Sequence, residues 1–218
     1  GSGACSQESE VRSQKPEVKR QKSEVRSHPE FTRFDILNIV ASYLDSKVVV
    51  SNLGIPSKEL FHIKPQQSNF YMLGSMGMVA PIGLGIALTA KKEVVVIDGD
   101  GSILMNPGTL ATVAKTSPKN LTILAIDNSS YGSTGNQPTA TSDVVNLAQV
   151  AIGFGIKNTI IASSKKEIIK AVRSKASGPR FIHILAKAGN KDVPNIPLGP
   201  DEIKKQVMRV LKSRESRK

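Results

Sequence analysis

Two strongly apolar runs constrain the fold of this chain more than any other feature: VVVI at 94–97 and LTILAI, interrupted only by Thr122, at 121–126. Such runs indicate strands that are buried on both faces, as in a parallel sheet covered by helices. The pattern predicts further strands at 48–50, 70–73, 160–161 and 181–185, and helices at 31–45, 56–60, 75–90, 107–116, 143–154, 164–176 and 200–212. This alternation predicts a doubly wound α/β domain over 31–212, with a mainly parallel sheet and helices on both faces.

Two helix starts have recognisable caps in the sequence. Ser142 is the expected N-cap of the helix at 143–154, because a hydroxyl before a helical pattern can accept from the first free backbone N–H groups. Ser164 and Glu167 have the spacing of a capping box, which predicts a helix that begins immediately after Ser164.

The two ends of the chain differ from this domain. Residues 1–30 repeat a polar unit of about seven residues (SEVRSQK, PEVKRQK, SEVRSH) with one Val in each copy. A coiled-coil seam needs two apolar positions per heptad, so we expect a disordered, solvated tail. Residues 213–218 are expected to form a short basic tail.

Composition excludes several classes of protein. No apolar run approaches the roughly 20 residues that cross a bilayer, which argues against an integral membrane protein. The single cysteine, Cys5, cannot build a zinc ribbon or an iron–sulfur cluster within one chain. The net charge of +12 suggests an anionic partner, but no nucleic-acid-binding motif is recognisable. A phosphorylated cofactor or a small polyanionic substrate fits the charge equally well.

The residues that follow the two apolar runs carry the chemistry. The first run leads into DGDGS (98–102) and the second into DNSSYG (127–132), and in a parallel sheet both lie at carboxyl ends of strands, where open α/β sheets bind ligands. Glycines let backbone N–H groups approach a phosphate. Asp100 and Asn128 supply hard oxygens of the kind that Mg²⁺ takes. Glycine-rich turns of an ordinary α/β domain are the alternative interpretation.

The spacing of these motifs resembles that of the thiamine diphosphate (ThDP) enzymes, whose motif is GDG–x(24–27)–NN. Here 25 residues (102–126) separate Gly101 from Asp127, and Asp127 replaces the first Asn. The resemblance implies that Asp100, the Asn128 side chain and the Ser130 carbonyl bind Mg²⁺. It also implies that Gly101 and Ser102 contact the diphosphate.

Two further segments resemble the same family. GSMG (74–77) is similar to the segment beneath the aminopyrimidine, which implies that the Gly74 carbonyl accepts from the 4′-amino group and that Met76 bends the cofactor. NLGIPS (52–57) is similar to the first strand-end loop, which faces the diphosphate. Without this context Met76 would be read as a core methionine. The implied cofactor-binding residues are Asn52, Gly54, Ser57, Gly74, Ser75, Met76, Gly99, Asp100, Gly101, Ser102, Asn128, Ser130, Tyr131 and Gly132.

A closer resemblance, over nearly all of 31–205, is to the sulfopyruvate decarboxylase β-subunit family. SNLGIPSKEL, FYMLGSMG, VVVIDGDGSILMN, DNSSYGSTGNQPTATS and NKDVPNIPLGP carry it. It implies a cytoplasmic, heteromeric lyase of coenzyme M biosynthesis that decarboxylates 3-sulfopyruvate to sulfoacetaldehyde. The chain has room only for the diphosphate-binding (PP) domain, so a Pyr-domain α subunit is expected to supply the activating Glu. The lone chain is expected to be inactive.

No catalytic residue is assigned with certainty from the sequence. Thr134 and Gln137 are candidates, with helix-start capping as the alternative, and pyruvate decarboxylases carry a catalytic Glu near the position of Thr134. His183 is expected to be a structural histidine in a strand, and no Lys or Arg is singled out for the substrate.

Other functions stay open from the sequence alone. The chain resembles to a lesser degree phosphonopyruvate decarboxylase, an acetolactate synthase-like subunit and a 2-oxoacid:ferredoxin oxidoreductase β subunit. The last of these usually needs iron–sulfur clusters, which this chain's single cysteine does not support. A non-catalytic protein that binds ThDP or nucleic acid is the alternative from another class.

Overall fold

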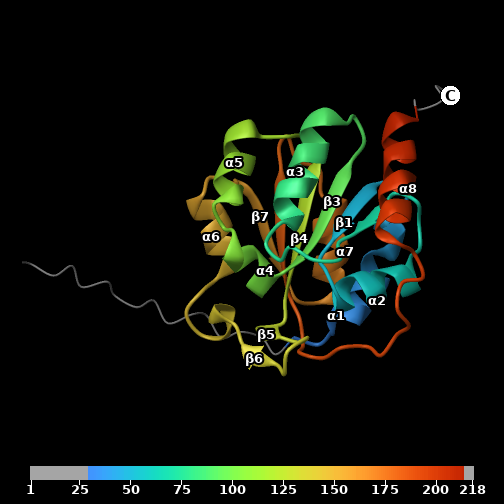
Figure 1. Cartoon of the computed structure of the whole chain (residues 1–218). Coiled ribbons are helices and arrows are strands. Elements are labelled where there is room, and N and C mark those ends of the chain that lie inside the picture. Colours follow the sequence, from blue (N-terminus) through green and yellow to red (C-terminus); the bar gives the residue numbers. More distant parts are fainter. Residues whose placement is uncertain (1–28, 214–218) are drawn as a thin grey trace, which may run out of the picture.

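A computed structural model describes residues 29–213, so the tails predicted at 1–30 and 213–218 lie almost entirely outside the described residues. Its centre is a six-stranded sheet in the order β2-β1-β3-β4-β8-β7, in which all neighbours are parallel (Figure 1). A separate antiparallel pair, β5 and β6, projects beyond one edge of the sheet (Figure 1). The strands are β1 Val48–Ser51, β2 Asn69–Tyr71, β3 Val94–Gly99, β4 Leu121–Asp127, β5 Ser130–Tyr131, β6 Gln137–Pro138, β7 Asn158–Ala162 and β8 Arg180–Leu185.

Helices cover both faces of the sheet, as the apolar runs predicted. One face packs against α1, α2 and α7, the other against α3, α5 and α6, and α8 lies along the edge strand β2 (Figure 1). The helices are α1 Arg33–Val40, α2 Ile55–Ile63, α3 Val79–Thr89, α4 Asp100–Met105, α5 Thr109–Thr116, α6 Leu147–Gly153, α7 Lys165–Arg173 and α8 Pro200–Lys212, with 3₁₀ turns at Ala41–Leu44 and Ala140–Ser142. No helix between residues 29 and 213 is long and apolar enough to span a membrane.

The alternation of side chains along β3 explains why both faces need helices. Val94 and Val96 pack into one core cluster, whereas Val95 and Ile97 pack into the cluster on the opposite face. All four are at most 1% exposed. Successive side chains of a strand point to opposite faces, so a run of apolar residues is stable only when each face is covered. The predicted doubly wound architecture is confirmed.

Several predicted helix boundaries were wrong. The helix expected at 143–154 begins at Leu147, and its N-cap is Asn146, whose Oδ1 accepts from the backbone N–H groups of Ala148 and Gln149. Ser142 is instead the last residue of a 3₁₀ turn. The threonines just before it hold this turn in place by hydrogen bonds to residues at the ends of β3 and β4. The helix expected at 75–90 begins at Val79, and the one expected at 31–45 ends at Val40 and continues as a 3₁₀ turn. The capping box of Ser164 and Glu167 is confirmed.

The order of the strands locates the ligand-binding edge. From β1 the chain moves outward to β2, then crosses back over β1 to β3, so the strand order reverses between β1 and β3. The carboxyl ends of β1, β3 and β4 therefore lie side by side at a topological switch point. The segments that leave these ends begin at Asn52, Asp100 and Asn128.

Two glycines of α3 provide a matched test of this packing. A Cβ on Gly83 would lie 2.1 Å from Val96 Cγ2, whereas one on Gly85 would meet nothing within 4 Å. We expect Gly83→Ala to lower the free energy of unfolding by about 1–3 kcal/mol because it overpacks the core. Gly85→Ala should raise it by about 0.5–1 kcal/mol, since alanine favours a helix. Urea unfolding measures both; a Gly83→Ala variant as stable as Gly85→Ala would contradict the packing of α3 on β3.

Candidate cofactor-binding site

A cavity of about 310 Å³ opens at the carboxyl ends of β1, β3 and β4. The register of the sheet brings its two motifs together, because Gly99 on β3 pairs with Ile126 on β4, one residue before Asp127. Most of the residues predicted from the sequence line this cavity: Asn52, Gly54, Met76, Gly99, Asp100, Gly101, Ser102, Asn128, Ser130, Tyr131, Gly132 and Thr134.

Four predicted residues lie elsewhere. Ser57 is buried and donates its hydroxyl to the Asn52 carbonyl at 2.6 Å, so it fastens the turn after β1. Gln137 pairs with Thr134, through Thr134 Oγ1 to Gln137 Oε1 at 3.0 Å and Gln137 Nε2 to the Thr134 carbonyl at 2.7 Å. Gly74 and Ser75 line a second cavity.

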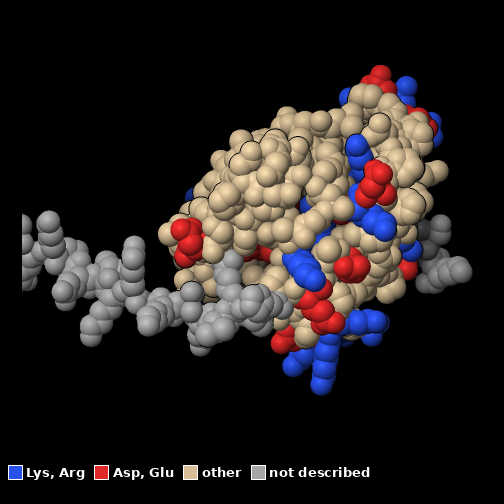
Figure 2. All heavy atoms as spheres, turned by 90° about the horizontal axis from the view of Figure 1, so that it is seen from below, with Lys and Arg blue, Asp and Glu red and all other residues tan. Residues whose placement is uncertain are grey.

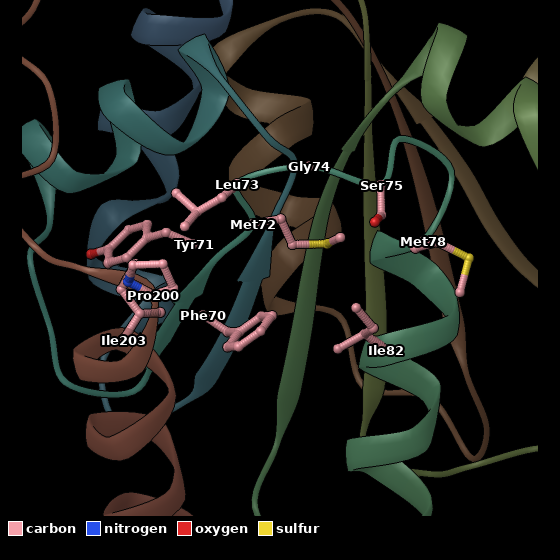
Figure 3. A pocket seen from close by; sticks show the side chains of 10 residues that line it. All are labelled: Phe70, Tyr71, Met72, Leu73, Gly74, Ser75, Met78, Ile82, Pro200 and Ile203. Carbon is pink, nitrogen blue, oxygen red and sulfur yellow. The ribbon is translucent and has the colours of Figure 1, made fainter.

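This second cavity, of about 330 Å³, is apolar and lies between β2, α3 and α8 (Figure 3). Figure 3 shows the Gly74–Ser75 loop crossing above it. Met78, the N-cap of α3, and Ile82 of α3 lie on one side, and Pro200 and Ile203 of α8 lie on the other. Met76, which follows directly in the chain, lines the first cavity. The loop at 74–76 therefore separates the two cavities.

Two buried carboxylates share hydroxyl groups at the edge of the first cavity. Asp100 Oδ2 accepts from the hydroxyls of Thr139 and Thr141, the latter at 3.2 Å. Thr141 Oγ1 also lies 2.6 Å from Asp127 Oδ1, so its one O–H is shared between the two carboxylates and bridges the ends of β3 and β4. Burial, together with the negative charge of Asp127, raises the pKa of Asp100 above its usual value. A cation beside Asp100 would offset both effects.

Asp127 has a second buried partner, His183. The register of β4 and β8 pairs Ala125 with His183, and this places His183 Nε2 2.8 Å from Asp127 Oδ2. Burial alone would raise the pKa of Asp127, but hydrogen bonds from His183 and Thr141 outweigh it and hold the pKa below the usual value. His183 is 1% exposed and lies inside the strand, in agreement with the structural role expected from the sequence.

Three groups of residues at the first cavity were not predicted from the sequence. Asp98 lines the cavity, and burial raises its pKa to about 7; its place in the DGDGS motif was an available signal. Thr139 and Thr141 contact Asp100, although they lie 39 and 41 residues further along the chain. Arg33 also lines the cavity and nothing in the local sequence pointed to it.

The donor set suits a divalent ion that is also bound by phosphate. Asp100, Asn128 and Ser130 offer carboxylate, amide and carbonyl oxygens around one cavity. Among the described residues, no group of three or more His, Cys, Asp or Glu is placed to hold a metal. Mg²⁺ is commonly bound by one or two protein oxygens, with water and phosphate completing its octahedron. The residues present therefore fit Mg²⁺ together with a phosphorylated ligand.

Close packing of the two loops explains one glycine of the motif. A Cβ on Gly101 would lie 2.3 Å from Tyr131 Cε1. Any larger residue would push the Tyr131 ring away and separate the loop after β3 from the loop after β4. Gly54 has φ +73° with open space around it, so there the requirement comes from the backbone turn.

Comparison with known proteins agrees with this geometry. Residues 50–184 match the family of thiamine pyrophosphate enzymes, C-terminal TPP binding domain. The chain is 46% identical over 185 residues to sulfopyruvate decarboxylase subunit beta of Methanococcus maripaludis, covering 84% of this chain and 99% of that protein. It is also 46% identical over 186 residues to sulfopyruvate decarboxylase of Methanosarcina acetivorans, covering 84% of this chain but only 48% of the relative.

More distant relatives share the same core. Phosphonopyruvate decarboxylase of Streptomyces viridochromogenes is 37% identical over 188 residues, which are 85% of this chain and 47% of the relative. A solved thiamin diphosphate-dependent enzyme from Mycobacterium smegmatis, described as putative, superposes with a TM-score of 0.61 at 21% identity, over 73% of this chain and 32% of that one. The chain belongs to the thiamine pyrophosphate enzymes, and within them to the family of sulfopyruvate decarboxylase beta subunits.

Thr141 provides a direct test of the carboxylate network. Thr141→Val removes the bridging hydroxyl and leaves Asp127 Oδ1 and Asp100 Oδ2 each with one donor fewer. We expect the free energy of unfolding at pH 7 to fall by about 1–3 kcal/mol, whereas Thr141→Ser, which keeps the hydroxyl, should lose much less. Thr112→Val, at an exposed position of α5, is the control and should change little. A Thr141→Val variant as stable as the wild type would contradict the bridging role of the hydroxyl.

Proposed function

We propose that this chain is the ThDP- and Mg²⁺-binding subunit of a heteromeric decarboxylase that converts 3-sulfopyruvate to sulfoacetaldehyde and CO₂. The observation that carries the proposal is the juxtaposition of Asp100 and Asn128 at the ends of β3 and β4. The likeness to sulfopyruvate decarboxylase subunit beta, over nearly the whole length of that protein, supports the substrate.

The residues of the first cavity divide between the metal and the diphosphate. Asp100, the Asn128 amide oxygen and the Ser130 carbonyl would hold Mg²⁺. The diphosphate would lie among the backbone groups and side chains of Asn52, Gly54, Gly99, Gly101, Ser102, Tyr131 and Gly132. Ser57 contributes indirectly, because it holds the Asn52 carbonyl. When bound, ThDP supplies the electron sink that decarboxylation of a 2-oxo acid requires.

The loop at 74–77 is held where it can orient the rest of the cofactor. The Gly77 N–H donates to Ser102 Oγ at 3.1 Å, and Asn106 Nδ2 donates to the Gly77 carbonyl at 3.3 Å. These bonds tie the loop to α4, which begins at the proposed metal ligand Asp100. Met76 can then act as the wedge beneath the cofactor and the Gly74 carbonyl as the acceptor for its 4′-amino group.

Half of the active site must come from a second subunit that carries the activating Glu. Among the described residues that line the first cavity the acids are Asp98 and Asp100, and no Glu is present. The loop at 74–78 is surrounded by exposed apolar side chains, with Leu73 58%, Met78 41% and Met105 62% exposed. A Pyr-domain partner that covered these side chains would close the site and exclude water from it.

Proton transfer to the product is not assigned to Thr134 or Gln137. Thr134 reaches the cavity, but its hydroxyl donates to Gln137, and the Gln137 amide returns a bond to the Thr134 backbone. This mutual pairing fits a turn between β5 and β6 better than an acid–base role. Neither side chain has a pKa near neutral pH, which a general acid at this step needs.

Reconstitution with the partner subunit tests the proposed function. The mixture should release CO₂ from 3-sulfopyruvate in a reaction that needs Mg²⁺ and ThDP, whereas the lone chain should release none. Asp100→Asn should weaken metal binding and therefore reduce turnover at limiting Mg²⁺ by ~10- to 100-fold or more. Asp143→Asn, an equal charge change at an exposed position, is the control.

The outcomes separate the proposal from its rivals. Faster turnover of phosphonopyruvate than of 3-sulfopyruvate would identify a phosphonate substrate. Full activity of the lone chain, or an Asp100→Asn variant that needs no more Mg²⁺ than the wild type, would contradict the proposed division of the site.

A further inference from the structure

Arg33 is a basic residue that the fold brings into the first cavity from a distant part of the sequence. It begins α1, the helix that precedes β1. A backbone bridge between Thr32 and Lys187, two residues past the end of β8, fixes this start at the carboxyl-end edge of the sheet. Arg33 is the one Lys or Arg among the described residues that line this cavity.

The Arg33 guanidinium is held in a fixed orientation by a buried carboxylate. Nε donates to Glu59 Oε2 at 2.7 Å and Nη2 to Glu59 Oε1 at 3.1 Å. The Glu59 side chain is 0% exposed and that of Arg33 11% exposed. A bidentate pair of this kind fixes the plane of the guanidinium as well as its position. Arg33 is therefore preorganised, unlike a surface lysine that samples many rotamers.

The hydrogen bonds of Arg33 leave one end of the guanidinium available. A guanidinium carries five N–H donors. Nε uses its one, and Nη2 donates to Glu59 and to Asn190 Oδ1, the latter at 2.9 Å. Nη1 donates to no residue within 29–213. Both N–H groups of Nη1 can therefore serve a ligand.

The same cluster connects Arg33 to the proposed diphosphate loop. Asn190 Nδ2 donates to the Gly132 carbonyl at 2.8 Å, and the Lys191 N–H donates to Glu59 Oε1 at 2.9 Å. Gly132 lines the cavity beside Arg33. The Arg33–Glu59 pair thus holds the segment at 190–191 against the loop that follows β4.

The surroundings also favour an anion. Lys187 and Lys191 lie near Asp35 in the first turns of α1 and, after hydrogen bonds from Thr32, help to lower its pKa. Figure 2 views the molecule from the side of β5 and β6, and side chains of both signs, Lys and Arg as well as Asp and Glu, gather on one half of this face.

We propose that Arg33 is the anion-binding residue of the cavity and donates through Nη1 to a tetrahedral oxyanion. This inference rests on the proposed function, which offers two such groups: the terminal phosphate of the cofactor and the sulfonate of the substrate. Arginine suits either, because its planar, permanently charged fork matches phosphate and sulfonate oxygens. Glu59 orients the guanidinium and does not contact the ligand.

Variants of the ion pair separate ligand binding from structural support. Arg33→Met alone leaves Glu59 buried without its partner, so the double variant Arg33→Met with Glu59→Gln removes both charges and keeps the core neutral. Glu59→Gln alone keeps the guanidinium and an oxygen that can accept from Arg33 and Lys191. Lys170→Met, at an exposed position of α7, matches the loss of one positive charge.

The probes are Mg²⁺ with inorganic pyrophosphate, measured by calorimetry, and 3-sulfopyruvate, measured as KM at saturating ThDP, both on the complex with the partner subunit. We expect Arg33→Met and the double variant either to weaken pyrophosphate binding or to raise the KM for 3-sulfopyruvate. The change should be about 10- to 100-fold, the loss expected for a charge-assisted hydrogen bond. Lys170→Met should stay within about 2-fold of the wild type, whereas Glu59→Gln, which keeps the guanidinium but loses the bidentate pair that orients it, should weaken the same probe less than Arg33→Met does. Weaker pyrophosphate binding identifies the cofactor phosphate as the anion, and a raised KM with unchanged pyrophosphate binding identifies the substrate sulfonate.

Two outcomes would overturn the inference. The first is a double variant with unchanged pyrophosphate affinity and unchanged KM. The second is a Lys170→Met variant that loses as much as Arg33→Met, which would mean that the net charge of the chain and not Arg33 accounts for the loss. Either result with an active wild-type complex leaves the proposed function intact, whereas a wild-type complex that binds no Mg²⁺–pyrophosphate and releases no CO₂ contradicts the proposed function itself.

Discussion

The burial of two carboxylates at the ends of adjacent strands is the constraint on which the rest of this structure depends. Asp100 and Asp127 are each 2% exposed, and like charges so placed repel each other and lose hydration. Thr139, Thr141 and His183 compensate with hydrogen bonds; the two threonines come from one turn and His183 comes from β8. The strand register, the turn at 139–142 and the position of β8 must all be correct for these bonds to form, so the fold and the site are specified together.

The compensation is unequal, and this inequality has a functional consequence. Asp127 receives enough hydrogen bonds to stay ionised, with its pKa lowered, while the pKa of Asp100 is raised. A divalent cation near Asp100 would supply what its hydroxyl partners do not. Arg33, which lines the same cavity, is itself held by buried Glu59. The cavity therefore has a carboxylate that favours a metal and a guanidinium that favours an anion, which together suit a metal–phosphate ligand.

The sequence predicted those parts of the fold that rest on local periodicity. Apolar runs located β3 and β4, and two strand-end motifs located the loops after them, because parallel strands must end at one edge. Short elements such as α4 and the β5–β6 pair escaped prediction, since two to six residues carry too little periodicity. The N-cap of α6 at Asn146 was not predicted because Thr139 and Thr141 form hydrogen bonds with Asp100. This tertiary contact shifts the start of the helix. Arg33 was missed for the same reason, since its partner Glu59 lies 26 residues away.

The most direct test is a crystal structure of this chain with its partner subunit, grown with Mn²⁺ in place of Mg²⁺ and with pyrophosphate. Anomalous scattering would locate the metal without reference to the fitted side chains. We predict a peak about 2.1 Å from a carboxylate oxygen of Asp100 and from Asn128 Oδ1, with pyrophosphate oxygens completing the coordination. A metal bound away from these two side chains, or pyrophosphate bound outside the cavity between the loops at 98–102 and 127–132, would contradict the proposal that the ends of β3 and β4 form one cofactor site.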